Sequence, residues 1–490
     1  MTLTKTFIAL LSIFTFFFSP LCNCQNTFEF TIKDTLTDQV INDAVELEDG
    51  SFILLAHEVF PANHSKAHLL RLSRSGILIQ SKTVVYMEKS STFLQIIKLE
   101  PNLFVLSGIT HIPDSNRMWL YEMDSLFNEV RSKIFPTGNY DFSYTCDLTV
   151  NNNNIICSGV VETSPTVFYR FIYKISPTFD SLQFRVFTEH ISPFEIDLLV
   201  KSYNRGYYAI IPNFGPPANV VIADLDTSFA IKHIYGVPND VSHYPEAKWI
   251  NSATFILAVK KDIPQYPPES PYQRIEVMCL DTLGNLIHDH FIGTPDTVEW
   301  PGLRSRLDYI DTNVIYVGGT HNFCQASEFC PVNCWFSLNQ MDSLLNVHWE
   351  HFYGGDANYT MYGIRATKDK GCLMFGSRYD LQATNPERDI YVIKVDQNGI
   401  VTGTGDQPDP KFHHAIVFPN PGKDYLIVES GSQIQGSEMI MYDMQGNQVF
   451  HKIIQSPHIE VNTRALPCGA YLWQIMNEEK VIEKGRWIKL

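Results

Sequence analysis

The sequence predicts an all-β protein, in which a long repeat of short strands is followed by a smaller β-module with a different pattern. Aromatic residues make up 13% of the 490 residues, with 32 Phe and 23 Tyr, and such side chains favour strands because they pack well on a pleated face. An apolar strand pattern returns seven times along the chain, with polar turn residues between the strands. These observations favour a fold built from strands.

The repeat is defined by an apolar run that returns roughly every 50 residues, a spacing typical of propeller-like repeats. The seven runs begin at Phe52, Leu103, Ile155, Tyr207, Phe255, Val314 and Cys372. A second apolar strand follows each run and ends where Asp or Ser opens a turn, at Ser73, Asp124, Ser176, Asp226, Asp281, Asp342 and Asp396. The short side chain can bond its own turn backbone, and a Gly three residues later, as at Gly76, Gly284 and Gly399, supplies the positive φ.

Two further strands complete each unit. One follows the turn, as at 77–85, 285–293 and 346–354, and the other precedes the apolar run. We expect the preceding strands at 41–47, 93–99, 145–150, 196–201, 247–251, 307–310 and 363–367. Four short antiparallel strands per unit are typical of a β-propeller blade, which must stack on its neighbours to cover its faces. We therefore predict a seven-bladed β-propeller over residues 25–403.

The two ends of the repeat complement each other. The seventh unit has no convincing outer strand, because the chain after Ile400 reads VTGTGD, whereas residues 27–33 form an unassigned alternating strand. We predict that this N-terminal strand completes the seventh blade and ties it to the first, which removes an exposed sheet edge. The alternative is a frayed terminal strand.

Residues 1–24 have the pattern of a signal peptide. Lys5 precedes an apolar core at 7–18 that is too short to span a bilayer comfortably, and cleavage after Cys24 would leave Gln25 as the first mature residue. A lipoprotein acylated at Cys22 or Cys24 is the alternative. No other run approaches membrane-spanning length, so we expect no transmembrane segment in the mature chain. The net charge of -16 argues against a nucleic-acid partner, which would need a basic surface.

Four potential metal ligands lie close together in the sequence: His321, Cys324, Cys330 and Cys334. Thiolate and imidazole groups are preferred ligands of zinc, so these residues are a candidate zinc site. Their spacing lacks the C-x2-C pairs of a strong zinc motif. A disulfide among the three cysteines, in keeping with export from the cytosol, is therefore the favoured interpretation.

A second disulfide could join Cys146 and Cys157, which flank a predicted hairpin turn at 151–154. Such a bridge needs the two residues to face each other across adjacent strands, and the sequence does not settle that register.

No catalytic or cofactor motif is present. The sequence holds no G-x-S-x-G elbow, no H-E-x-x-H, no P-loop and no EF-hand loop. We therefore expect no cofactor and assign no catalytic residue. Asp308 and Asp311 lie close together but flank a predicted strand end. Paired carboxylates facing a propeller axis would come from distant parts of the chain, so the sequence pattern does not identify them.

The C-terminal module occupies residues 413–490, behind a linker at 404–412 whose Gly, Pro and Asp residues argue against a strand. Seven short strands are predicted there, at 415–418, 425–429, 438–442, 448–454, 458–462, 470–476 and 481–489. This number and length of strands indicate a small antiparallel sandwich of immunoglobulin-like proportions.

Short motifs within this module point to a known family. The residues that carry them are Pro419, Asn420, Pro421, Asp424, Tyr442, Asp443, Gly446, Leu466, Gly469 and Tyr471, followed by a basic closing strand. The module resembles the type A C-terminal sorting domain of the Bacteroidetes type IX secretion system. The resemblance implies export through the periplasm, recognition by the outer-membrane secretion machinery, and release or anchoring at the cell surface. A carbohydrate-binding or spacer sandwich is the alternative.

Export combined with the lack of a catalytic motif favours a secreted or surface-displayed propeller that binds an extracellular protein or glycan. The alternative is a propeller hydrolase or lyase with its site on the axis, and a purely structural surface-layer component is a third hypothesis. Clustered Asp, Glu, His and Arg at one mouth of the channel would favour the enzyme, whereas exposed aromatic or apolar patches would favour binding.

Overall fold

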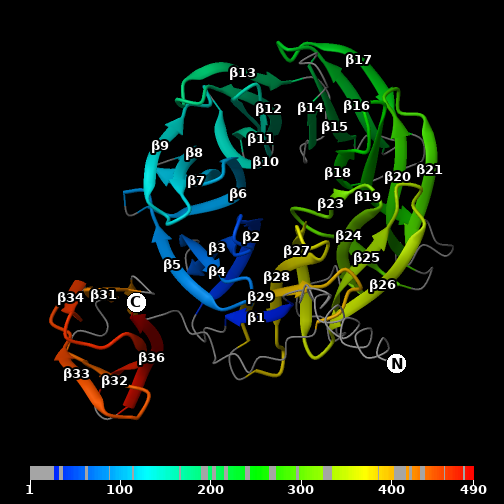
Figure 1. Ribbon diagram of the computed structural model, residues 1–490. Coiled ribbons are helices and arrows are strands. Elements are labelled where there is room, and N and C mark those ends of the chain that lie inside the picture. The colour runs from blue at the N-terminus through cyan, green and yellow to red at the C-terminus, as the bar shows by residue number, and fades with distance from the viewer. Residues whose placement is uncertain are drawn as a thin grey trace, which may run out of the picture.

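The computed structural model describes residues 27–32, 37–60, 64–87, 89–112, 115–138, 140–164, 167–188, 197–200, 206–213, 219–237, 243–263, 272–293, 297–323, 334–383, 386–401, 415–418, 422–430, 436–456, 458–477 and 480–489. All regular elements within these ranges are strands, so they include no helix able to cross a membrane. The predicted signal peptide and linker lie outside them. Figure 1 shows the strands of the repeat arranged as blades around one axis, and the C-terminal strands as a separate module.

Within the described residues, seven antiparallel sheets make up the propeller. The first three blades consist of β2 (Asp38–Glu46), β3 (Phe52–Phe60), β4 (His64–Leu72) and β5 (Leu78–Val84); of β6 (Ser91–Glu100), β7 (Leu103–Ile112), β8 (Ser115–Asp124) and β9 (Glu129–Phe135); and of β10 (Asp141–Asn151), β11 (Asn154–Ser164), β12 (Val167–Ile175) and β13 (Ser181–Phe187). The fourth and fifth blades consist of β14 (Asp197–Val200), β15 (Tyr207–Asn213), β16 (Asn219–Leu225) and β17 (Ile231–Gly236), and of β18 (His243–Trp249), β19 (Thr254–Ile263), β20 (Tyr272–Asp281) and β21 (Leu286–Ile292). The sixth blade consists of β22 (Glu299–Pro301), β23 (Leu307–Asp311), β24 (Val314–His321), β25 (Trp335–Met341) and β26 (Val347–Gly354), and the seventh of β27 (Asn358–Ala366), β28 (Cys372–Tyr379) and β29 (Arg388–Val395) with β1 (Phe28–Ile32).

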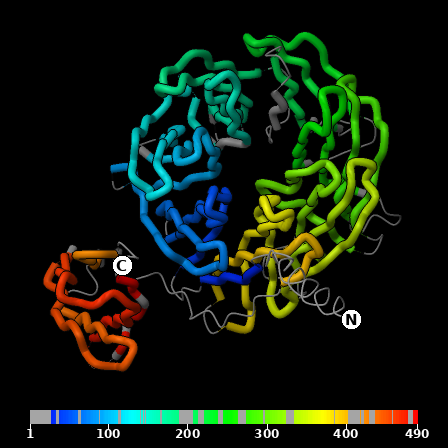
Figure 2. The backbone as a smooth tube through the Cα atoms, in the orientation of Figure 1, coloured from blue at the N-terminus to red at the C-terminus, as the bar shows by residue number. Residues whose placement is uncertain are grey.

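The predicted seven-bladed fold is confirmed. The seven apolar runs are the second strands of the blades, and they are almost fully buried between neighbouring blades. The first strand of each blade lies nearest the axis, and the fourth lies on the outside, where in the first six blades most side chains are exposed or half-buried. Figure 2 shows the chain passing around the axis blade by blade, from blue at the N-terminus to yellow.

The N-terminal strand closes the ring, as predicted. β1 pairs antiparallel with β29, with Phe30 opposite Val392, and Phe28, Phe30 and Ile32 are buried in the cluster between the last and first blades. The Arg388 backbone N–H also donates to a carboxylate oxygen of Asp38 in the first blade, at 2.9 Å. Closure therefore rests on both backbone pairing and apolar burial.

The sixth blade differs from the prediction. Its inner position holds two short strands, β22 and β23, that both pair with β24, whereas only the second was expected. The intervening segment 302–306 leaves the sheet because it bonds to the next blade: the Leu303 N–H donates to the Met361 carbonyl at 3.2 Å, and the Ile364 N–H donates to the Ser305 carbonyl at 3.0 Å. The inner strand of the seventh blade also begins earlier than predicted, at Asn358.

The seven turns after the second apolar strand have the predicted side-chain bonds. At Asp124, for example, one carboxylate oxygen accepts from the N–H groups of Leu126 and Asn128 at 2.8 and 2.9 Å. The predicted glycines Gly76, Gly284 and Gly399 have φ between 74° and 81°. In the other four turns the same left-handed position is taken by Phe127, Phe179, Phe229 and Leu345, with φ between 61° and 64° and buried side chains. Burial of a large side chain offsets the backbone strain there.

The C-terminal module has two sheets, one of order β30-β31-β34 and one of order β33-β32-β35-β36. The strands are β30 (Ala415–Phe418), β31 (Tyr425–Ser430), β32 (Glu438–Tyr442), β33 (Gln448–Ile453), β34 (His458–Asn462), β35 (Gly469–Asn477) and β36 (Lys480–Lys489). All seven match the predicted strands to within one or two residues. Apolar residues of both sheets, among them Leu426, Met441 and Trp487, form one core, as expected of a sandwich.

Candidate functional site in the axial channel

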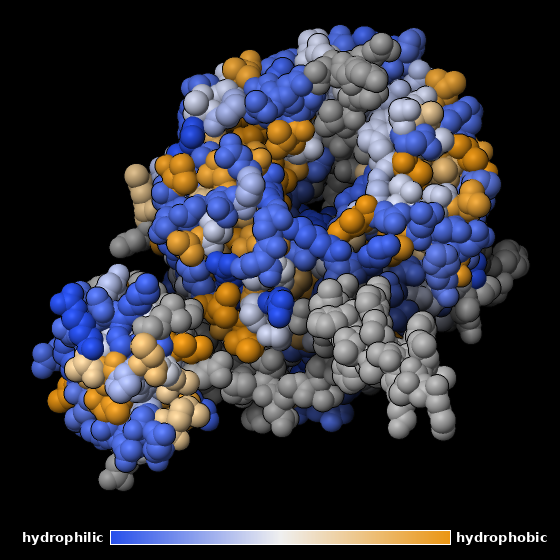
Figure 3. Space-filling view, viewed as in Figure 1, coloured by the Kyte–Doolittle hydropathy of each residue, from blue (hydrophilic) through white to orange (hydrophobic). Residues whose placement is uncertain are grey.

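The centre of the propeller holds a polar cavity of about 270 Å³. The space-filling view is hollowed at this centre, and hydrophilic and hydrophobic side chains both border the hollow (Figure 3). The lining residues are Asp43, Gln95, Ile96, Ile97, Asp147, Leu148, Thr149, Pro245, Glu246, Ala247, Lys248, Leu303, Arg304, Ser305, Arg306 and Arg365. They come from the inner strands β2, β6, β10, β18 and β27 and from segment 302–306, so residues distant in sequence meet here.

A β-bulge directly precedes the main polar residue that each of four inner strands contributes. The pairing register shifts immediately before Asp43 in β2, Gln95 in β6, Asp147 in β10 and Glu246 in β18. A bulge adds one residue to a strand and so turns the following side chains to the other face. The repeat thereby turns these polar side chains toward the axis, while the residues before the bulges include the core residues Ile41 and Phe93.

Arg365 joins the seventh blade to the first across the cavity wall. Its guanidinium donates to a carboxylate oxygen of Asp43, to the Ala44 carbonyl at 3.0 Å and to the Ser305 hydroxyl. The other oxygen of Asp43 accepts from the Ile96 N–H at 3.0 Å. Burial raises the pKa of Asp43, although the positive charge of Arg365 opposes that effect. Both oxygens of Asp43 are therefore engaged in holding three blades together.

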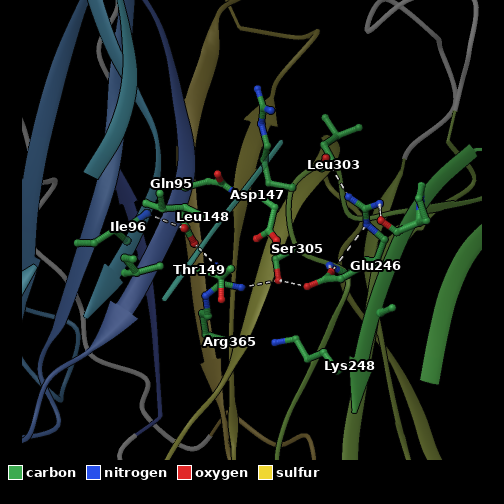
Figure 4. Close-up of a pocket in the computed structure, with 16 residues that line it drawn as sticks. Gln95, Ile96, Asp147, Leu148, Thr149, Glu246, Lys248, Leu303, Ser305 and Arg365 are labelled. Atoms are coloured by element: carbon green, nitrogen blue, oxygen red, sulfur yellow. Dashed lines mark hydrogen bonds and ion pairs between the residues drawn. The ribbon is translucent and has the colours of Figure 1, made fainter. Parts of the chain in front are cut away.

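Glu246 fixes the position of segment 302–306. One oxygen of its carboxylate accepts from the backbone N–H groups of Arg306 and Leu307, and the other accepts from the Ser305 hydroxyl at 3.2 Å. The Arg306 guanidinium also binds β18, because it donates to the Pro245 carbonyl at 3.0 Å. Figure 4 shows the chain of bonds from Arg365 through Ser305 to Glu246.

Lys248 forms the third charged contact of the site. Its ammonium group lies 2.6 Å from a carboxylate oxygen of Asp308 in β23. Burial alone would lower the pKa of Lys248, but Asp308 and Glu246 outweigh burial and raise it. The second oxygen of Asp308 accepts from the Ala366 N–H at 2.8 Å. Asp308 lies in β23, whose last residue is Asp311, and its carboxylate connects three blades.

An aromatic pair of the fifth and sixth blades lies next to Arg306, one of the residues that line the cavity. The rings of Tyr244 and Trp300 lie 5.3 Å apart, and the Arg306 guanidinium lies 5.9 Å from the Tyr244 ring. The Lys260 ammonium group is 4.4 Å from the Trp300 ring. Tyr244 has φ of 56° inside the bulge of β18, which is an uncommon conformation for a bulky side chain and is often found at functional sites.

His321, a predicted zinc ligand, is engaged with a carboxylate. Its Nδ1 lies 2.5 Å from an oxygen of the buried Glu299, and this hydrogen bond raises the pKa of His321 despite its burial. The Cys334 thiol lies 3.1 Å from the Asn322 carbonyl, while Cys324 and Cys330 lie outside the described residues. Among described residues, no three His, Cys, Asp or Glu side chains are grouped so as to hold a metal ion. The zinc site and the disulfide both remain predictions.

The possible bridge between Cys146 and Cys157 also remains a prediction. Cys157 is buried and pairs with Leu148, while Cys146 occupies the bulge between Thr145 and Asp147. The Cys146 side chain lies outside the described part of the structure.

The described motif residues of the C-terminal module have structural roles. Asp443 accepts from the Gln445 and Asn447 N–H groups at 2.9 and 2.8 Å, and Gly446 has φ of 86°, so this turn repeats the turn chemistry of the propeller. The Tyr471 hydroxyl donates to the Pro467 carbonyl at 2.6 Å. Leu466 packs against the core. Pro419, Asn420 and Pro421 lie outside the described residues.

Comparison with known proteins gives one family match and several distant structural likenesses. The β-propeller domain of the Trilobed protease from Pyrococcus furiosus is 9% identical with a TM-score of 0.41, covering 74% of this chain and 98% of that one. A PL25 ulvan lyase has 10% identity and a TM-score of 0.41, covering 75% and 96%. A subtype N11 neuraminidase-like protein of A/flat-faced bat/Peru/033/2010 has 11% identity and a TM-score of 0.37, covering 78% of this chain and 92% of that one.

These likenesses are too distant to bear on activity, and no curated protein sequence matches the chain. Residues 416–489 match the family described as the secretion system C-terminal sorting domain. The chain is therefore a β-propeller protein that carries a type IX secretion C-terminal sorting domain at residues 416–489 and is secreted or displayed at the cell surface.

Proposed function

We propose that the propeller is an extracellular binding module that takes a ligand from a protein or glycan partner into its axial cavity, while the C-terminal module directs secretion and surface anchoring. The cavity of about 270 Å³ is close to the lower size of small-ligand sites. It lies where loops and inner strands of several blades meet, so a ligand there could be contacted from many directions at once.

The observation that carries this proposal is the engagement of the cavity carboxylates. Charged residues do cluster on the axis, which on its own would favour an enzyme. However, both oxygens of Asp43 and both oxygens of Glu246 already accept hydrogen bonds from the protein. A general acid or base must exchange its proton with a substrate, whereas these groups hold the cavity wall in place. The arrangement supports a preformed binding site.

A hydrolase or lyase remains the second candidate, favoured by Asp147, which lines the same cavity. A single carboxylate of this kind could act as a general base, although a glycosidase needs two. Release of reducing ends or unsaturated products from a polysaccharide panel, lost in Asp147→Asn, would favour the enzyme over the binding module.

Binding is tested with glycan and protein arrays and the full mature chain. Thr149→Trp should abolish binding of whichever ligand is found, because an indole would occupy much of the cavity that Thr149 lines. Leu126→Trp is the matched control, since Leu126 is 59% exposed on an outer turn. Unchanged binding in Thr149→Trp, or no ligand on either array, would contradict the proposal.

A further inference from the structure

Arg304 differs from the other cations of the cavity. Arg365 is paired with Asp43, Lys248 with Asp308, and Arg306 with Glu246. The Arg304 backbone is fixed, since its N–H donates to the Tyr362 carbonyl at 2.6 Å. No residue in the described part of the chain accepts a hydrogen bond from its half-buried guanidinium. A positioned cation without a partner in a partly enclosed site attracts an anionic ligand group.

His57, in β3 of the first blade, adds a neutral donor within electrostatic range of Arg304, although it is not one of the residues that line the cavity. The Asn42 Nδ2 lies 2.6 Å from the Phe93 carbonyl, so this atom is the NH2 end of the amide. Its second proton points to the His57 Nδ1 at 3.0 Å, which leaves the His57 proton on Nε2. Burial, followed by the positive charge of Arg304, lowers the pKa of His57 to about 4. At neutral pH His57 is therefore an uncharged N–H donor, and no described residue accepts from its Nε2.

The aromatic pair Tyr244–Trp300 supplies an apolar surface next to Arg306, which lines the cavity together with Arg304. Trp300 lies in β22, four residues before Arg304, and Tyr244 lies in β18, two residues before Glu246. Both rings are only half-buried. Their neighbouring cations, Lys260 and Arg306, border the same surface. Aromatic faces next to a few fixed polar groups are typical of sites for amphipathic ligands such as sugar rings.

We infer that the ligand of the axial cavity is an acidic saccharide, whose carboxylate or sulfate group is bound by Arg304 with help from the His57 Nε2–H, and whose sugar ring packs on Tyr244 and Trp300. This inference rests on the proposed binding function and specifies its ligand. An acidic peptide would satisfy Arg304 equally well, but it gives no reason for the strained Tyr244 beside Arg306, so the saccharide is favoured.

The test is isothermal titration of the full mature chain with polygalacturonate, chondroitin sulfate, uncharged dextran and poly-L-glutamate, at low and physiological salt. We expect binding of at least one acidic polysaccharide and none of dextran. Arg304→Ala should weaken that binding about tenfold or more, because it removes a charge-assisted contact, and Arg304→Lys should weaken it less. Trp300→Ala should weaken binding, whereas Trp300→Phe keeps a ring and should bind nearly as the wild type does.

Arg464→Ala is the control, since Arg464 is highly exposed in the C-terminal module. Circular dichroism melting of each variant separates loss of binding from loss of folding. Equal affinity in Arg304→Ala, equal binding of dextran, binding of poly-L-glutamate alone, or no binding of any of the four probes would each overturn the inference. If none of the four probes binds but Thr149→Trp loses binding of a ligand found on the arrays, the proposed binding function stands and only the ligand class is wrong. If the arrays reveal no ligand, both the proposed binding function and this inference fail.

Discussion

Closure of the propeller by its N-terminal strand predicts a large effect from a single substitution. Phe30 is 1% exposed and lies in the cluster shared by the first and last blades. Truncating such a ring removes its burial and leaves a cavity, which typically costs 3–5 kcal/mol. Phe30→Ala should therefore lower the free energy of unfolding of the propeller by about 3–5 kcal/mol. Deleting residues 25–34 should have a larger effect, because it also exposes the edge of β29.

Two measurements together test this prediction. Calorimetry reports the transition of the propeller, and hydrogen exchange of the β29 amides reports the pairing with β1 directly. Both variants should melt earlier and exchange faster at β29. Ile79→Ala is the matched control: Ile79 is 49% exposed on β5, so its loss should change stability by no more than about 0.5 kcal/mol. A stability change in Phe30→Ala that matches the control, with unchanged exchange in β29, would show that the strand does not close the ring.

Four further predictions concern a turn, two histidines and the cysteines. Phe127→Gly should relieve about 1–2 kcal/mol of left-handed strain but lose a buried ring worth 3–5 kcal/mol, so urea titration should show net destabilisation; a gain would contradict the turn analysis. The folded-state pKa of His57 is lowered to about 4, so the stability that neutral His57 contributes is fully present above pH 6.5 and is lost as pH falls towards 4. The loss should reach up to about 3 kcal/mol in the free energy of unfolding. The His57→Gln variant should not show this loss when its stability is measured between pH 7 and pH 4. His321 has a raised pKa, so its contribution is present below pH 6.5 and is lost as pH rises through the folded pKa; His321→Gln should cost more stability at pH 6 than at pH 9. Elemental analysis and thiol titration of the purified protein should show a disulfide among Cys324, Cys330 and Cys334 and no zinc, and stoichiometric zinc would reverse that interpretation.

Much of the propeller could be predicted because its repeat is local. Apolar runs, turn residues and the closing strand each occupy a short stretch, and period-2 alternation identifies them. The turns with Gly could be explained from sequence, but Phe127 and its counterparts could not. Their positive φ depends on burial of the ring, which is a tertiary effect.

The cavity could not be predicted, for two physical reasons. Its residues come from five inner strands and a connecting segment, so no spacing in the sequence brings Asp43, Glu246 and Arg365 together. Bulges also break the alternation directly before Asp43 and Glu246, so a strict inward and outward pattern assigns them to the wrong face. The signal in the sequence that could have located the cavity is a polar residue that repeatedly interrupts the apolar pattern of the inner strands.

The most direct test of the axial site is the footprint of a bound ligand on the backbone. Hydrogen exchange of the full mature chain, with and without the ligand identified on the arrays, should show protection in segment 302–306 and in β18 around Glu246. The outer strands β5, β9 and β26 and the C-terminal module should exchange unchanged. Protection of the outer strands or of the C-terminal module, with no change in segment 302–306, would contradict binding in the axial cavity.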